Sequence, residues 1–286
     1  MEIIIGKNAG FCYGVERAVN GAKKVLEENR EGKVYALGEI VHNKEVVNEL
    51  EKQGLKCVED IKEAEKQVVL RAHGVSKQVY EQAEKQGLNI KDFTCKKVLK
   101  IHEIVREYAK DGYYIILTGT KNHPENIGTI SYCGENSNII ETVDSVAEVI
   151  EDIKNKKSNR VLLIAQTTFS MAKFKEIESI IKQEISKLNI EIVIKNTICA
   201  ATAIRQKEVE ELSKIVDNMI IIGGKNSSNT KKLYNISKEN AKTYLIETFK
   251  ELNKEEFQNV KKVGIMAGAS TPKKSILEVK EFLEKI

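Results

Sequence analysis

The sequence predicts an α/β protein in which a strand, a polar loop and a helix recur along the chain. Short apolar runs end in glycine or small polar residues and are followed by a helical pattern, as in "YYIILTGTKNHPE" and "RVLLIAQTTFS". Continuous apolar runs of this kind are typical of strands buried in largely parallel sheets. The 286 residues provide enough chain for two or three compact units.

An internal repeat relates three parts of the chain. Cys95 precedes Gly119 by 24 residues, and Cys199 precedes Gly223 by the same interval. The chain then reads "GTKNHPEN" in one copy and "GGKNSSNT" in the other. A third copy starts near the N-terminus, where "GFC" is followed by the loop "GEIVHNKE". The repeat therefore predicts three related α/β units.

We expect these units at residues 14–95, 96–193 and 194–286, joined by an N-terminal strand at 1–13. Each unit has a second loop after a second strand, and these loops read "AHGVS", "AQTTFS" and "AGAST". Ligands of open parallel sheets bind in loops at the carboxyl ends of the strands. A pseudo-threefold arrangement would therefore direct six loops at one central cavity.

Three of the five cysteines occupy the same place in the repeat. Cys12, Cys95 and Cys199 each stand directly before a predicted helix. At such a position the helix dipole and the unpaired amide groups favour the thiolate, which is the form that binds metal. Cys57 and Cys133 have no distinctive surroundings, and we expect them to be buried or inert.

Three thiolates directed at one cavity favour an iron–sulfur cluster over zinc. No fourth cysteine is in register, and a cubane cluster can leave one iron open for a substrate. The open iron could act as a Lewis acid and as a path for electrons. Zinc remains the plain alternative for the same cysteines.

The predicted loops are rich in polar side chains. Three of the four histidines lie there (His42, His73 and His123), whereas His102 lies in a helical pattern and is expected to be structural. Glu125 is a loop carboxyl group that can deliver a proton. Hydroxyl and amide donors beside predicted helix N-termini suit a phosphate group. These donors are Thr167, Thr168, Asn226, Ser227, Ser228, Asn229 and Ser270.

Bulk composition is that of a protein without membrane or nucleic-acid contacts. The 46 basic and 42 acidic residues interleave on predicted helices, as in "KEIESIIKQEISK", so no basic nucleic-acid surface is expected. No apolar run is long enough to span a membrane, and the N-terminus has no pattern of an export signal. We therefore expect a cytoplasmic protein.

Nine motifs, in order and across essentially the whole chain, resemble the family of 4-hydroxy-3-methylbut-2-enyl diphosphate reductases. These are iron–sulfur oxidoreductases of the non-mevalonate pathway of isoprene biosynthesis. The motifs read "GFCYGVERA", "VHNKEVV", "RAHGVS", "TC", "HPENIGT", "AQTTFS", "TICAAT", "KNSSN" and "AGAS".

The resemblance implies a trefoil-like fold of three α/β domains around a [4Fe–4S] cluster held by Cys12, Cys95 and Cys199, with one open iron that binds the substrate hydroxyl group. Two electrons and two protons then expel this group as water, giving isopentenyl and dimethylallyl diphosphates. Loss of the open iron in air leaves a [3Fe–4S] cluster, so an incomplete cluster is compatible with this function.

The resemblance also implies roles for loop residues and partners. Glu125 is the proton donor, His123 completes the pocket, and Thr167 orients the substrate hydroxyl and the proton relay. The remaining substrate-binding residues are His42, His73, Thr168, Ser227, Ser228, Asn229 and Ser270. A monomer is expected, with an allylic diphosphate as substrate. Ferredoxin or flavodoxin is expected to supply the electrons, because the sequence has no convincing nucleotide-binding fingerprint.

Two motifs depart from the family pattern. The usual "DATCP" is "DFTCK" here, with Phe93 and Lys96, and the usual "GHPE" is "NHPE", with Asn122. The expected ligands are unchanged, and what these departures could alter is the local shape of the backbone.

Two other functions could use the same cysteines. A cluster dehydratase such as quinolinate synthase would turn over without an electron donor. A cluster-based sensor or electron carrier would not bind allylic diphosphates tightly. A colourless anaerobic preparation that carries zinc would support the zinc site.

Overall fold

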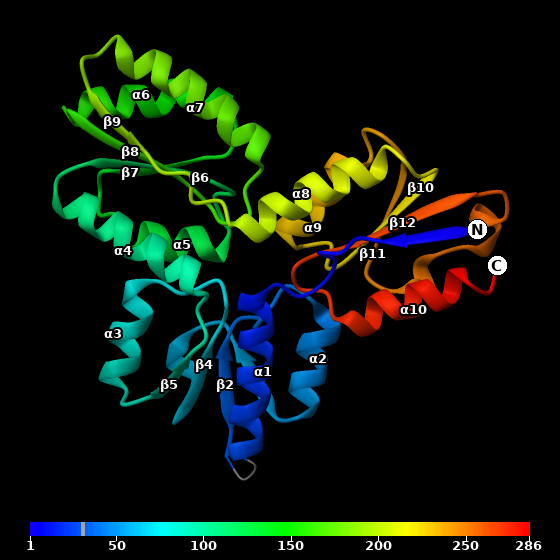
Figure 1. Cartoon of the computed structure of the whole chain (residues 1–286). Coiled ribbons are helices and arrows are strands. Elements are labelled where there is room, and N and C mark those ends of the chain that lie inside the picture. The colour runs from blue at the N-terminus through cyan, green and yellow to red at the C-terminus, as the bar shows by residue number, and fades with distance from the viewer. Residues whose placement is uncertain (30–31) are drawn as a thin grey trace. The chain divides into compact units, whose positions relative to one another are not determined.

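The computed structural model describes residues 1–29 and 32–286, and these residues form three four-stranded sheets connected by helices (Figure 1). All neighbouring strands are parallel. The predicted α/β class with parallel sheets is therefore confirmed. No helix in these two ranges has the length and apolar character needed to cross a membrane.

Contacts within the chain define two compact bodies, which are described separately. The terminal body comprises residues 1–24, 39–54 and 200–286, and the central body comprises residues 25–38 and 55–199. Helix α1 (Tyr13–Glu28) begins in the terminal body and ends in the central body.

The central body contains two sheets, with strand orders β3-β2-β4-β5 and β7-β6-β8-β9. Its elements are β2 (Val34–Leu37), β3 (Leu55–Val58), η1 (Ile61–Glu63), β4 (Gln67–Leu70), α3 (Lys77–Lys85), β5 (Asn89–Asp92), α4 (Lys96–Lys110), β6 (Tyr114–Thr118), α5 (Pro124–Ile130), β7 (Ser137–Ile140), η2 (Val143–Ser145), α6 (Val146–Asn155), β8 (Arg160–Ala165), α7 (Met171–Ser186) and β9 (Glu191–Ile194).

The terminal body contains one sheet, with strand order β1-β12-β10-β11. Its remaining elements are β1 (Glu2–Ile5), α2 (Lys44–Lys52), α8 (Ala200–Ser213), β10 (Asn218–Ile222), α9 (Ser228–Ser237), β11 (Lys242–Ile246), η3 (Phe249–Glu251), η4 (Lys254–Phe257), β12 (Lys262–Ala267) and α10 (Lys273–Leu283).

The three sheets share one strand order. In each sheet the edge strand beside β4, β8 or β12 is β5, β9 or β1, respectively. These three edge strands lead directly to Cys95, Cys199 and Cys12. The internal repeat of the sequence therefore corresponds to a repeat of topology, in which the first residues of the chain supply the edge strand of the last sheet.

The expected unit boundaries at 14–95, 96–193 and 194–286 stay predictions, and so does the pseudo-threefold arrangement around a cavity. The N-terminal strand expected within 1–13 is present as β1, which pairs with β12.

The strands of the second central sheet are buried on both faces. Along β6, Tyr114 and Ile116 pack in the core cluster that includes α6 and α7, whereas Ile115 and Leu117 pack in the cluster that includes α4. Successive side chains of a strand point to opposite faces, so a continuous apolar run fills two cores. Figure 1 shows α6 and α7 on one face of this sheet and α4 and α5 on the other.

The terminal sheet follows the same rule. Ile220 and Ile222 of β10 pack in the cluster that includes α10, and Met219 and Ile221 pack in the cluster that includes α8 and α9. Because both sheets are held from two sides, the carboxyl ends of their strands are fixed positions from which loops begin.

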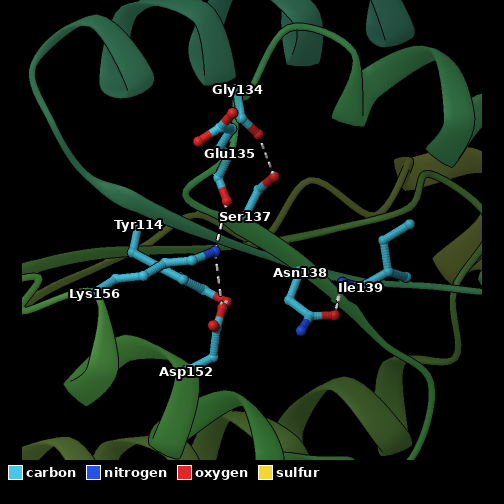
Figure 2. A network of polar contacts seen from close by, with 8 residues as sticks. All are labelled: Tyr114, Gly134, Glu135, Ser137, Asn138, Ile139, Asp152 and Lys156. Atoms are coloured by element: carbon cyan, nitrogen blue, oxygen red, sulfur yellow. Dashed lines mark hydrogen bonds and ion pairs between the residues drawn. The ribbon is translucent and has the colours of Figure 1, made fainter.

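A polar network fastens α6 to the amino end of β6 (Figure 2). The Tyr114 hydroxyl donates to the Asp152 carboxylate at 2.5 Å, and the Lys156 ammonium lies 3.1 Å from the same carboxylate. Lys156 also donates to the carbonyl of Glu135 at 2.6 Å. Burial and the Asp152 hydrogen bond raise the pKa of Tyr114. This network secures the end of the sheet opposite to the loops that carry the predicted site residues.

His102 of α4 packs against the loop that follows β4 and contains Gly74. Its imidazole is 4% exposed and stacks on Tyr132, with ring centroids 4.7 Å apart. A Cβ at Gly74, whose φ is +74°, would lie 3.1 Å from the His102 ring. Burial lowers the pKa of His102 to about 4, opposed by Asp92 and assisted by Arg106. His102 is therefore a neutral packing residue, as the sequence predicted.

His102 makes the fold sensitive to acid. Below its ordinary pKa of 6.5 the unfolded chain binds a proton at this side chain, whereas the folded protein binds it only near pH 4. Stability is therefore lost as the pH falls through this window, by about 3 kcal/mol at most from this residue. In His102→Phe we expect the free energy of unfolding, measured with urea, to fall less between neutral pH and about pH 4. An equal fall in both proteins would contradict this account.

Candidate active site

The site residues begin where the central strands of each sheet end. Thr118 pairs with Ala165 at the ends of β6 and β8, and the Gln166 amide donates to the Thr118 carbonyl at 2.8 Å. In the terminal body, Ile222 pairs with Ala267, and the Gly268 amide donates to the Ile222 carbonyl at 2.8 Å. The first and second loops of a sheet therefore start side by side.

The three repeated cysteines have the same backbone geometry. Each amide donates to the carbonyl two residues beyond β4, β8 or β12, and the next residue begins a helix. The bonds are Cys95 to Ala72 at 3.0 Å, Cys199 to Thr167 at 2.9 Å and Cys12 to Ala269 at 3.1 Å. All three side chains are partly exposed thiols. The predicted placement of each thiol before a helix is confirmed.

A polar side chain fixes the residues that precede each cysteine. Glu208 accepts from the amides of Lys7 and Asn8 at 2.5 and 3.0 Å. Asp92 accepts from the Thr94 amide at 2.8 Å, and Asn196 accepts from the Ile198 amide at 3.1 Å. Sequence reasoning did not identify Glu208, Asp92 or Asn196, although Asp92 and Asn196 have a detectable signal as Asx residues two positions before the amides they bind.

Glu125 and Thr167 form a buried pair. The Thr167 amide donates to one carboxyl oxygen of Glu125 at 2.6 Å, and the Thr167 hydroxyl donates to the other at 2.6 Å. Glu125 is 1% exposed and lies in the first turn of α5. Because the Thr167 carbonyl accepts from the Cys199 amide, this one residue connects a predicted metal ligand to the predicted proton donor.

His123 caps α5. Its Nδ1 accepts from the Glu125 amide at 3.2 Å, so the neutral ring carries its proton on Nε2. The His123 ring lies edge-on to His73, with centroids 5.4 Å apart. The structure therefore brings His73, His123, Glu125 and Thr167 together in the central body.

Gln166 organises the same loops but was missed as a site residue. Its side-chain oxygen accepts from the Thr120 amide and from Asn126, both at 3.0 Å. Its amide nitrogen donates to the Thr168 hydroxyl at 2.8 Å. The orientation of Thr168 is thus set by a residue whose importance arises from contacts distant in sequence.

The terminal body holds the loop at residues 226–229, which was predicted to bind a phosphate group and which leads into α9. The Ser227 hydroxyl caps the helix by accepting from the Thr230 amide at 3.3 Å. The ammonium group of Lys232 donates to the Ser228 hydroxyl at 2.8 Å, which places a cation beside the loop. Sequence reasoning missed Lys232, although its spacing of four from Ser228 on one helix is a signal.

Asn229 is a buried residue of this loop with unsatisfied polar atoms. It is 4% exposed, and neither polar atom of its side chain has a hydrogen-bond partner among the described residues. A buried amide without partners is costly, and a bound polar group would satisfy it. Asn229 follows Gly223 by the same interval as Glu125 follows Gly119.

His42 and Ser270 meet within the terminal body. The Ser270 hydroxyl donates to the His42 carbonyl at 3.1 Å, and the His42 ring lies 3.5 Å from the Glu39 carboxylate. A Cβ at Gly224 would lie 2.5 Å from the same carbonyl, so the approach of these two loops requires glycine.

The other cysteines differ from the repeated three. Cys133 is buried, and burial raises the pKa of its thiol to about 12, so it is inert as predicted. Cys57 lies on β3 and is partly exposed. Of the departures from the family pattern, Lys96 and Asn122 are exposed and Phe93 is partly buried.

The predicted site residues fall into two groups. Cys12, His42, Ser227, Ser228, Asn229 and Ser270 lie in the terminal body, and Cys95, Cys199, His73, His123, Glu125, Thr167 and Thr168 lie in the central body. The convergence of all three thiols on one cluster stays a prediction. Three soft sulfur donors with equivalent backbone geometry fit a cubane cluster, since thiolates are its ordinary ligands.

Comparison with known proteins gives one consistent answer. A family model described as LytB protein matches residues 3–284. The 4-hydroxy-3-methylbut-2-enyl diphosphate reductase of Aquifex aeolicus (strain VF5) is 44% identical over 100% of this chain and 97% of its own length. The enzyme of that name from Clostridioides difficile (strain 630) is 43% identical over the full length of both chains.

Solved structures agree with this result. One structure of (E)-4-hydroxy-3-methyl-but-2-enyl diphosphate reductase, the terminal enzyme of the non-mevalonate pathway, is 43% identical and covers 100% of both chains with a TM-score of 0.72. The E-1-hydroxy-2-methyl-but-2-enyl-4-diphosphate reductase of Plasmodium falciparum is 32% identical, with a TM-score of 0.88 over 99% of this chain and 87% of that chain.

The close approach at Gly224 predicts a binding defect. In Gly224→Ala the added carbon displaces the His42 carbonyl, which is bonded to Ser270. We expect the dissociation constant for inorganic diphosphate, measured by calorimetry, to rise about tenfold, as for the loss of one good polar contact. Gly32→Ala is the control, because its backbone does not have a positive φ and its Cβ would lie 3.8 Å from the nearest atom, the Asn29 carbonyl oxygen. Unchanged affinity in Gly224→Ala would show that this loop does not bind the ligand.

Proposed function

The chain belongs to the LytB protein family, and on this basis we propose that it reduces 4-hydroxy-3-methylbut-2-enyl diphosphate to isopentenyl and dimethylallyl diphosphates. The reaction breaks the bond between carbon and the hydroxyl oxygen, consumes two electrons and two protons, and releases water. The chain therefore needs an electron path, a proton donor and a diphosphate site.

The continuous connection from Cys199 through Thr167 to Glu125 carries the proposal. The Thr167 carbonyl accepts from the Cys199 amide, and its amide and hydroxyl donate to Glu125. In this arrangement the Thr167 hydroxyl oxygen keeps lone pairs that can accept a hydrogen bond from the substrate hydroxyl. A proton held by Glu125 can then reach the departing oxygen, and the two donors of Thr167 stabilise the remaining carboxylate.

Cys12, Cys95 and Cys199 would hold a [4Fe–4S] cluster, which when bound supplies electrons and a Lewis-acidic iron. Their thiols stand directly before α1, α4 and α8, in equivalent backbone positions. An incomplete cluster after exposure to air is compatible with this assignment.

The diphosphate would be bound mainly by neutral donors. Asn229 offers a buried amide, and Ser227, Ser228 and Ser270 offer hydroxyl groups at loop positions fixed by the strands. The N-terminus of α9 adds backbone amides and the positive end of a helix dipole. The remaining contacts are assigned to His42, His73, His123 and Thr168.

We further propose that a ferredoxin or flavodoxin supplies the electrons, and that the protein works as a cytoplasmic monomer. Its partners are then this electron donor and the allylic diphosphate. No role for a nucleic acid or a membrane is proposed, because acidic and basic residues interleave on the helices.

Replacement of the proton donor should separate chemistry from cluster assembly. In Glu125→Gln the amide can still accept from Thr167, so the fold is retained, but it cannot deliver a proton at neutral pH. We expect the turnover rate in an anaerobic reduced-dye assay to fall at least about a hundredfold, the usual size of such contributions. Iron and sulfide per chain should equal those of the unchanged protein. Glu107→Gln, at an exposed position of α4, is the control; full activity in Glu125→Gln would remove the proposed role.

Cysteine replacement tests the cluster itself. After anaerobic reconstitution we expect Cys12→Ser, Cys95→Ser and Cys199→Ser each to lose the cluster absorbance and turnover, since each removes one of three thiolates. Cys57→Ser should keep both. Zinc in place of iron and sulfide in the unchanged protein would defeat the proposal, and turnover without any electron donor would favour a dehydratase.

A further inference from the structure

We propose that Arg205 is a positioning residue, which fixes the backbone before Cys12 so that this thiol is held ready to bind the cluster. The inference rests on the proposed function, because it concerns one of the three proposed cluster ligands. It is drawn entirely from contacts within the terminal body.

The Arg205 side chain makes a buried bridge between two backbone segments. Arg205 lies on α8 and is 5% exposed. One terminal nitrogen donates to the Gly10 carbonyl at 2.8 Å, and the other donates to the Ala201 carbonyl at 3.1 Å. Gly10 stands two residues before Cys12, and Ala201 lies in the first turn of the helix that begins directly after Cys199. The guanidinium group thus ties the approach to Cys12 to the start of α8.

The backbone at Gly10 has little freedom to adapt. Its φ is +99°, and a Cβ there would lie 3.2 Å from both the Ile276 side chain and the Thr271 carbonyl. On the other side of the turn, the Cys12 amide donates to Ala269. The Gly10 carbonyl direction therefore determines where the following cysteine lies, and Arg205 is the side chain that holds it.

A second residue of α8 acts on the same segment. Glu208, three positions after Arg205 and on the same helix face, accepts from the amides of Lys7 and Asn8. Glu208 thus takes the donors at the beginning of the segment, and Arg205 satisfies the acceptor at its end. The negative carboxylate of Glu208 binds backbone amides, and the positive guanidinium of Arg205 binds a backbone carbonyl. Together the two side chains fix both ends of the segment 7–10.

The guanidinium group suits this role better than an amine would. It carries its charge at all ordinary pH values and presents donors in a rigid fork, so it can bond two carbonyls at once. A lysine could supply the charge but not the fixed two-carbonyl geometry. Substitutions at Arg205 can therefore separate geometry from charge.

Cluster retention is the direct test. We would reconstitute the protein anaerobically and measure iron and sulfide per chain and the rate of iron loss to a chelator. In Arg205→Gln, which removes fork and charge, we expect iron loss about tenfold faster, the size found for residues that orient metal ligands. In Arg205→Lys the rate of iron loss should lie between that of the unchanged protein and that of Arg205→Gln. The reduction potential should shift to more negative values in Arg205→Gln and recover in Arg205→Lys, because a buried cation favours the reduced cluster.

Two further variants control for loss of folding. Arg160→Lys makes the same substitution at an arginine that donates to the Asp111 carbonyl, at the amino end of β8 and away from the cysteines. It should leave iron retention and potential unchanged. Glu208→Gln alters a partly exposed side chain on the other end of the segment, and a smaller increase in iron loss is expected even if Arg205→Gln fails to fold.

The outcomes distinguish this inference from the proposed function. If the unchanged protein assembles no iron–sulfur cluster, the proposed function fails. If it assembles one and the Arg205 and Glu208 variants lose iron at the unchanged rate, only the positioning role is overturned. An equal increase in the rate of iron loss in Arg205→Lys and Arg160→Lys would also overturn the positioning role, since the effect would then be general to replacements of arginine by lysine.

Discussion

The structure depends on one repeated hydrogen bond, from the amide of a cysteine to a carbonyl just beyond the neighbouring strand. The acceptors are Ala72, Thr167 and Ala269, each in the second loop of its sheet. The bond joins the end of an edge strand to the loop of the adjacent strand, so the helix that follows starts at a fixed place. The same hydrogen bond therefore fixes where the thiol lies relative to the start of the following helix and to the residues of the neighbouring loop.

This constraint explains why the first residues of the chain belong to the last sheet. Strands β5 and β9, which lead to Cys95 and Cys199, directly follow the other strands of their sheets in sequence, whereas β1, which leads to Cys12, is distant in sequence from the other strands of its sheet. The edge position beside β12 is instead filled by β1, which pairs with it in parallel. One edge strand of the terminal sheet therefore comes from a segment distant in sequence, and Glu208 and Arg205 of α8 hold the residues that follow this strand.

Much of this arrangement could be predicted because local sequence signals agree with the tertiary structure. Continuous apolar runs predicted the strands, the residues after each cysteine predicted the helices, and Glu125 was noted as a carboxyl group within a polar loop. Among the residues that were missed, Arg205, Glu208 and Gln166 act over long sequence separations. Arg205 bonds Gly10 and Gln166 bonds Thr120, and nothing in a local window distinguishes them from other helix or loop residues. The positions of the three expected units relative to one another could not be predicted for the same reason, because local sequence patterns do not encode how compact units meet.

The repeat also explains how one architecture supplies different chemistry at equivalent positions. Glu125 and Asn229 stand at the same interval after the glycine that starts their loop, and both are buried in the first turn of a short helix. In the central body the position holds a carboxyl group, and the neighbouring Thr167 supplies two donors to it. In the terminal body the equivalent of Thr167 is Ala269, which has no hydroxyl group to offer, and the side-chain amide of Asn229 has no hydrogen-bond partner among the described residues. Equivalent positions thus carry a carboxyl group in one body and an amide in the other, on a repeated pattern of backbone bonds.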